Sequence, residues 1–157
     1  MPVESVSWNR VQEFIAELNS RYPPGHLWKW ALPTEEHWER ACRGDTSGAY
    51  AGNLDKMAWY ASNSGGNPHP VGTMPANPFG LNDMHGNVWE WCADWYGAYQ
   101  DGSATDPVGP ASGQDRVFRG GSILTGDWGC RAAYRGRTAP DSRFKDMGFR
   151  VAIVPAS

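Results

Sequence analysis

The stretch from residue 44 to residue 115 shows almost no helical or strand periodicity, and this limits the possible folds more than any other feature. Turn-forming residues recur every few positions, as in Asn63-Ser64-Gly65-Gly66 and Ala76-Asn77-Pro78. About seventy residues of true loop would be unusual in a compact domain. The chain has nine tryptophans to order such a segment, because large aromatic side chains bury much apolar area. We therefore expect one loop-rich domain, residues 1–157, whose core depends on aromatic side chains.

Two amphipathic helices are expected in the first third of the chain. Ser7 is a favourable N-cap, and apolar residues follow it at helical spacing: Trp8, Val11, Ile15 and Leu18. The prolines at 23 and 24 end this helix. A second helix should start at Thr34, with two glutamates in its first turn facing the positive end of the helix dipole, and should end near Gly44.

Short strands are expected at 88–95, 116–120 and 148–153, where β-branched and aromatic residues lie between glycines. Together with the two helices, they indicate an α+β fold. The net charge is −3, and the sequence contains neither a basic run nor an apolar run of about 20 residues. We therefore expect no nucleic-acid or membrane partner. The N-terminus, MPVESVSW, also lacks the features of a signal peptide.

Four segments together resemble the formylglycine-generating-enzyme family, the sulfatase-modifying factors. They are LPTEEHWERACRG (32–44), NPFGLNDMHGNVWEWCADWY (77–96), RVFRGGS (116–122) and CRAAYRGRTAP with GFRVA (between 130 and 152). The resemblance implies a C-type-lectin-like fold. Family domains usually start tens of residues earlier, with strands of their own, so it also implies that N-terminal strands are lacking. An open sheet edge would then favour self-association.

The central segment contains a candidate calcium site. The resemblance implies that calcium is bound by the side chains of Asp83 and Glu90 and by the backbone carbonyls of Gly86 and Val88. Calcium takes about six to eight oxygen ligands and mixes carboxylates with carbonyls. The residues alone leave an alternative open, in which Asp83 forms an Asx-turn and Glu90 pairs with an arginine.

The resemblance also implies catalytic roles for Ser122 and Cys130. The family's enzymes hold copper(I) between two cysteines five residues apart and oxidise a cysteine of a sulfatase to formylglycine. The first of these cysteines is Thr125 here. A threonine hydroxyl is a hard oxygen that does not replace a thiolate for copper(I), so copper is not expected. Cys130 is then interpreted as a small buried apolar residue.

The absence of a disulfide bond at Cys42 indicates the cellular compartment in which the protein is found. Where some family members have the partner of Cys42, this chain has Val151. The missing bridge favours a reducing, cytoplasmic location. Cys92 could still approach Cys130, and the sequence leaves this pairing open.

The C-terminal layout also resembles the variable proteins of diversity-generating retroelements, which display a ligand-binding surface on the same lectin-like fold. Trp128 and Phe144 are the natural anchors of such a surface, although a core position for Trp128 stays open. The candidate ligand-binding residues are Leu124, Thr125, Gly126, Trp128, Tyr134, Gly136, Thr138 and Phe144. We therefore expect a non-catalytic module that binds a protein or small molecule. The alternative is a copper-dependent formylglycine-generating oxidase.

Overall fold

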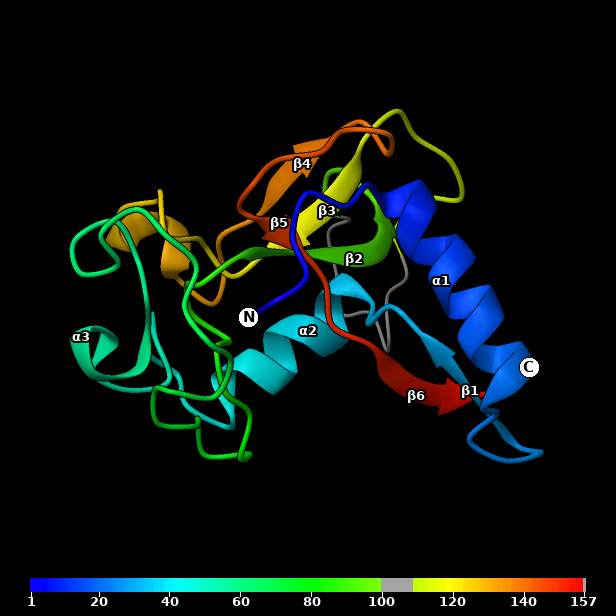
Figure 1. Cartoon of the computed structure of the whole chain (residues 1–157), viewed down its shortest axis with the longest axis horizontal. Coiled ribbons are helices and arrows are strands. Elements are labelled where there is room, and N and C mark those ends of the chain that lie inside the picture. Colours follow the sequence, from blue (N-terminus) through cyan, green and yellow to red (C-terminus); the bar gives the residue numbers. More distant parts are fainter. Residues whose placement is uncertain (100–108, 157) are drawn as a thin grey trace.

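The computed structural model describes residues 1–99 and 109–156, and it shows an α+β fold with two small sheets (Figure 1). This confirms the fold class expected from the sequence. The elements in chain order are α1 (Trp8–Arg21), β1 (Trp28–Ala31), α2 (Glu35–Arg43), α3 (Leu54–Met57), β2 (Trp89–Trp95), β3 (Arg116–Arg119), the 3-10 helix η1 (Asp127–Cys130), β4 (Gly136–Thr138), β5 (Met147–Gly148) and β6 (Ala152–Pro155).

Both predicted helices start and end as their local signals indicate. The Ser7 side chain accepts a hydrogen bond from the backbone N–H of Arg10 at the start of α1. The Thr34 side chain caps α2 in the same way, and Gly44 ends α2 in the left-handed conformation, with φ of 55°. The short helices α3 and η1 were not predicted, because four residues carry too little periodicity to be recognised.

The larger sheet has the strand order β4-β3-β2-β5, in which only the β2–β5 pair is parallel. A separate antiparallel pair joins β1 to β6. The single strand expected at 148–153 is therefore wrong, because β5 and β6 belong to different sheets. The chain leaves the first sheet between them, where Arg150 turns its guanidinium to Glu90.

Strand β2 lies between α1 and α2 and presents alternate side chains to each of them (Figure 1). Trp89 and Trp91 pack with Val11 and Ile15 of α1. The next side chains along the strand point the other way. Cys92 packs with Trp38 of α2, and Glu90 accepts a hydrogen bond from the Trp38 indole N–H at 2.7 Å. This alternation places the Glu90 carboxylate inside the molecule.

The outer edge of β1 is occupied by a side chain of α1. Asn19 accepts a hydrogen bond from the backbone N–H of Trp30 at 2.8 Å and donates one to its carbonyl at 2.9 Å. On the partner strand, Pro155 has no backbone N–H to offer. These features limit strand addition at the smaller sheet, and self-association stays a prediction.

Residues 44–88, the first part of the segment that lacks periodicity, form a lobe with α3 and η1 (Figure 1, left). The rings of Trp59 and His69 stack at 3.7 Å between centroids. The Asn87 side chain holds both backbone groups of His69. Gly86 has φ of +81°, and a Cβ atom there would lie 2.1 Å from the Trp59 carbonyl oxygen. Aromatic stacking and side-chain amides thus order this lobe, as the tryptophan content predicts.

Candidate functional site

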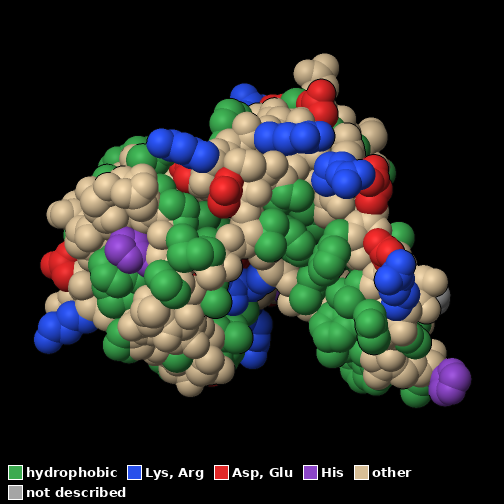
Figure 2. Space-filling model, viewed as in Figure 1, with side chains coloured by type: hydrophobic (Ala, Val, Ile, Leu, Met, Phe, Trp, Pro, Cys, Tyr) green, Lys and Arg blue, Asp and Glu red, His purple; other side chains and the backbone are tan. Residues whose placement is uncertain are grey.

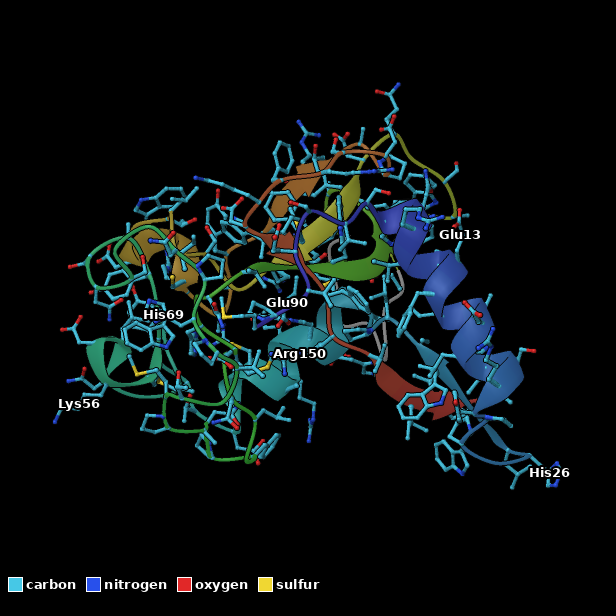
Figure 3. The ribbon with its side chains drawn as sticks, viewed as in Figure 1. Glu13, His26, Lys56, His69, Glu90 and Arg150 are labelled. Carbon is cyan, nitrogen blue, oxygen red and sulfur yellow. The ribbon has the colours of Figure 1, made fainter. Side chains whose placement is uncertain are left out.

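A cleft of about 530 Å³ brings together all four candidate calcium ligands, Asp83, Gly86, Val88 and Glu90. The N-terminal segment 1–3 and Phe149 form part of its rim. Figure 3 shows Glu90 and Arg150 close together at the centre of the molecule, between the lobe and the sheet. All four residues of the predicted calcium site therefore line the same cleft.

Glu90 is paired with an arginine, as the alternative interpretation holds. Arg150 donates two hydrogen bonds to the Glu90 carboxylate, with N–O distances of 2.6 and 2.7 Å. Trp38 donates a third. A carboxylate has about four lone-pair sites, so this arrangement leaves Glu90 limited capacity to bind a cation.

Asp83 has a carboxylate oxygen available for a ligand. Its Oδ2 accepts a hydrogen bond from the backbone N–H of Gly72 at 2.8 Å. Its Oδ1 is buried and has no hydrogen-bond partner within the described parts of the chain. Burial raises the pKa of Asp83, and the charge of Glu90 acts in the same direction, while the Gly72 N–H and Arg150 oppose it. A cation beside Oδ1 would satisfy this oxygen, so Asp83 fits the role of a calcium ligand, whereas Glu90 is held by Arg150 and Trp38.

Ser122 and Thr125 form a closed hydrogen-bonded turn. Their hydroxyl oxygens lie 2.9 Å apart, and Ser122 donates to the Asp146 carboxylate at 2.6 Å. Both residues are buried. Asp146 was not predicted as a site residue, because no local pattern links it to Ser122, 24 residues away. The serine hydroxyl is thus committed to structural hydrogen bonds.

Cys130 is fully buried, and burial raises the pKa of its thiol to about 12, with the charge of Asp127 adding to the effect. The thiol is therefore protonated in the metal-free protein, and copper(I), which binds the thiolate, would have to displace this proton. A second sulfur is also lacking. Cys42 and Cys92 belong to a different core cluster, and all three cysteines are free, so the possible pairing of Cys92 with Cys130 is wrong. This donor set does not fit copper(I).

The candidate ligand-binding residues divide into exposed and buried members. Trp128 is 56% exposed, so the core position considered for it is wrong, and Leu124 and Phe144 are each 48% exposed. The Trp128 ring makes an edge contact with half-buried Tyr134 at 5.1 Å. Gly126 and Thr138 are also half-buried.

Two of the candidates, Thr125 and Gly136, lie under the surface. A Cβ atom at Gly136 would lie 1.9 Å from the ring of Phe118, so close packing requires glycine at this position. The exposed surface therefore consists chiefly of Leu124, Trp128 and Phe144 with the edge of Tyr134. We call these four residues the aromatic surface.

The sequence profile of the sulfatase-modifying factor enzyme 1-like domain matches residues 1–154. The chain belongs to this family. It is 34% identical over 172 residues to the formylglycine-generating enzyme of Mus musculus and 36% identical over 173 residues to that of Streptomyces coelicolor. Each alignment covers 96% of this chain but 44% and 52% of these relatives, so the chain spans about half of their length.

Solved structures of the sulfatase-modifying-factor fold confirm the predicted architecture. Treponema denticola variable protein 1 superposes with a TM-score of 0.89 at 31% identity, over 96% of this chain and 70% of that one. PvdO from Pseudomonas aeruginosa superposes with a TM-score of 0.82 at 30% identity, over 96% of this chain and 61% of the other. The family assignment therefore rests on sequence and structure together.

The part of the chain that the structure describes contains no helix of sufficient length and apolar character to span a membrane. Figure 2 shows charged side chains of both signs around the edge of the viewed face, with apolar side chains between them.

Proposed function

We propose that this chain is a non-catalytic binding module on a sulfatase-modifying-factor scaffold. The observation that carries the proposal is the position of Thr125, which stands where the family's enzymes have a copper ligand and points its hydroxyl at Ser122. The buried Cys130 then has no partner sulfur. The retained Ser122 and Cys130 favour the oxidase as the second candidate, but their environment does not supply a two-thiolate site.

The aromatic surface supplies the binding function in this proposal. Each exposed side chain projects from a backbone that is held by hydrogen bonds. Ser122 accepts from the Leu124 N–H, Asp127 accepts from the Trp128 N–H, and the Phe144 carbonyl accepts from Ser5 and Met147. Rigid aromatic anchors on a fixed frame suit recognition, because little conformational entropy is lost on binding. The likeness to a variable protein of Treponema denticola supports a surface whose residues change while the scaffold stays constant, as in retroelement-encoded proteins.

The proposal predicts that the aromatic surface tolerates substitution. Leu124→Ala and Phe144→Ala should each change the free energy of unfolding by less than about 0.5 kcal/mol. Trp128→Ala should cost about 0.5–1.5 kcal/mol, because it loses the ring contact with Tyr134. Ile123→Ala is the matched control, since this neighbour of Leu124 is 1% exposed and should cost about 2–5 kcal/mol. Urea denaturation measures all four values.

Display selection then tests binding itself. A phage library randomised at Leu124, Trp128 and Phe144 should stay folded and yield binders to test proteins. A library randomised at the buried residues Ile123, Cys130 and Met147 should yield none. Loss of folding in the first library would contradict the proposal.

Calcium is part of the proposal as a structural ion held beside the unpartnered Asp83 Oδ1 in the cleft that Glu90 also lines. Because a ligand that binds only the native state raises stability, saturating Ca²⁺ at about 100 times the Kd should add about 2.7 kcal/mol. The melting temperature with Ca²⁺ and with a chelator measures the effect. Asp83→Asn should remove the difference, whereas Asp141→Asn, an exposed aspartate outside the cleft, should keep it. An unchanged melting temperature in the wild-type protein would eliminate the site.

A further inference from the structure

A second cleft, of about 480 Å³, opens beside the aromatic surface. Tyr60, Ala61 and Ser62 line one wall, and Gly126 and Asp127 line the other. The Trp128 indole lies against Gly126, because a Cβ atom placed on Gly126 would be 2.7 Å from the indole nitrogen. Asp127 thus lines the cleft, and the exposed Trp128 ring packs on Gly126, its neighbour in the same wall.

Both walls of this cleft are fixed by hydrogen bonds. The Ala61 N–H donates to the Thr125 carbonyl at 3.0 Å and so joins one wall to the other. Ser64 donates its hydroxyl to the Ile123 carbonyl at 2.8 Å. On the opposite side, the Tyr50 hydroxyl donates to the Asp127 carbonyl at 2.9 Å. The cleft therefore does not have to be organised when a ligand arrives.

Asp127 is the charged residue in the lining of the cleft. Asp127 lies on the surface, and Tyr60 donates its hydroxyl to Asp55, which is also exposed. This hydrogen bond raises the pKa of Tyr60, with burial and the charge of Asp127 adding to the effect. Burial likewise raises the pKa of Tyr50, and Asp127 adds to it while Arg131 opposes it. The Asp127 carboxylate is therefore the negative group in the wall of the cleft, while that of Asp55 accepts the Tyr60 hydroxyl.

We propose that this cleft binds the guanidinium group of an arginine side chain presented by a partner protein. The group would stack on the Trp128 indole and donate hydrogen bonds to the Asp127 carboxylate. A planar guanidinium is suited to both contacts, whereas an ammonium is a point charge. The protein already uses this pairing internally, because Arg116 lies 3.7 and 3.4 Å from the ring centroids of Trp8 and Trp95. This inference rests on the proposed binding function and names a ligand class for it.

The test uses N-acetyl-arginine amide as the probe and the neutral isostere N-acetyl-citrulline amide as its control. In ¹⁵N-labelled protein, the arginine probe should shift the backbone signals of Ala61, Ser62 and Gly126 and the Trp128 indole signal. Its dissociation constant should be about tenfold lower than that of the citrulline probe, because a charge-assisted hydrogen bond is lost in the isostere.

Variants at Asp127 and Trp128 test whether the arginine probe binds at this cleft. Asp127→Asn and Trp128→Ala should each weaken arginine binding about tenfold. Asp141→Asn, the control at an exposed aspartate outside the cleft, should leave binding unchanged. Circular dichroism confirms that each variant is folded.

Three results would overturn the guanidinium assignment. They are equal binding of the citrulline probe, equal binding of N-acetyl-lysine amide, and an Asp127→Asn variant that binds as well as the wild-type protein. The aromatic surface is tested independently by its tolerance of substitution and by display selection. A failed arginine titration beside successful selections would therefore remove this inference and leave the binding module in place.

Discussion

Replacement of Arg119 by methionine is expected to lower the free energy of unfolding by about 3–5 kcal/mol, as for the loss of one member of a buried ion pair. The Arg119 side chain is fully buried and donates to the carbonyls of Ala132 and Tyr134 at 3.0 and 2.8 Å. It also pairs with Glu35 and Glu39 of α2. One side chain thus joins β3, α2 and the segment after η1, and methionine takes the donor away from the Ala132 and Tyr134 carbonyls.

Two further variants separate this effect from a general effect of charge. Arg10→Met removes an exposed pair with Glu13, in which both side chains are 62% exposed, and should change stability by no more than about 0.5 kcal/mol. Arg119→Lys should lose most of the stabilisation that Arg119 contributes, because an ammonium does not reproduce the planar set of donors of a guanidinium. Denaturant unfolding measures all three. If Arg119→Met and Arg10→Met cost the same, the network does not stabilise the fold.

The parts of the fold that could be predicted from the sequence depend on neighbouring residues. Thr34 and Gly44 define α2 because a cap bonds to its own helix within one turn. The nine tryptophans also indicated a core that depends on aromatic side chains, and Trp38, Trp89 and Trp91 are buried in it. These predictions required only local rules and composition.

The parts that the sequence could not define depend on contacts between distant segments. The split of the 148–153 strand follows from the pairing of Arg150 with Glu90, 60 residues away. Whether Trp128 is a core or a surface residue depends on how η1 sits beside Tyr134. No local pattern contains such information, so tertiary packing decides it.

The second large effect concerns copper. A Thr125→Cys variant should bind copper(I) at least about a hundredfold more tightly than the wild-type protein, since losing a group that merely orients a ligand already costs about 10–100-fold in metal affinity. The substitution places a sulfur in the turn that also contains Ser122. The Thr125 methyl group packs against Gly129, the residue before Cys130, since a Cβ atom there would lie 2.1 Å from it. Competition with a chromogenic copper(I) chelator measures the affinity.

The gain should depend on Cys130. In the double variant Thr125→Cys with Cys130→Ser, the affinity should return to that of the wild-type protein, because one thiolate is again left alone. Cys42 and Cys92 are buried in another cluster and are present in every variant, so they serve as an internal control. An affinity that stays high without Cys130 would show that copper binds elsewhere.

The non-catalytic role is tested most directly by mass spectrometry of a substrate peptide. The peptide contains a cysteine in a CxPxR sequence, of the kind that the family's enzymes oxidise in sulfatases, and it is incubated with the wild-type protein, copper(I) and oxygen. The formylglycine-generating enzyme of Streptomyces coelicolor, which is 36% identical to this chain over 173 residues, serves as the positive control. We expect the peptide cysteine to remain unchanged in the presence of this chain. Conversion of that cysteine to the aldehyde at a rate comparable to the control would contradict a non-catalytic role.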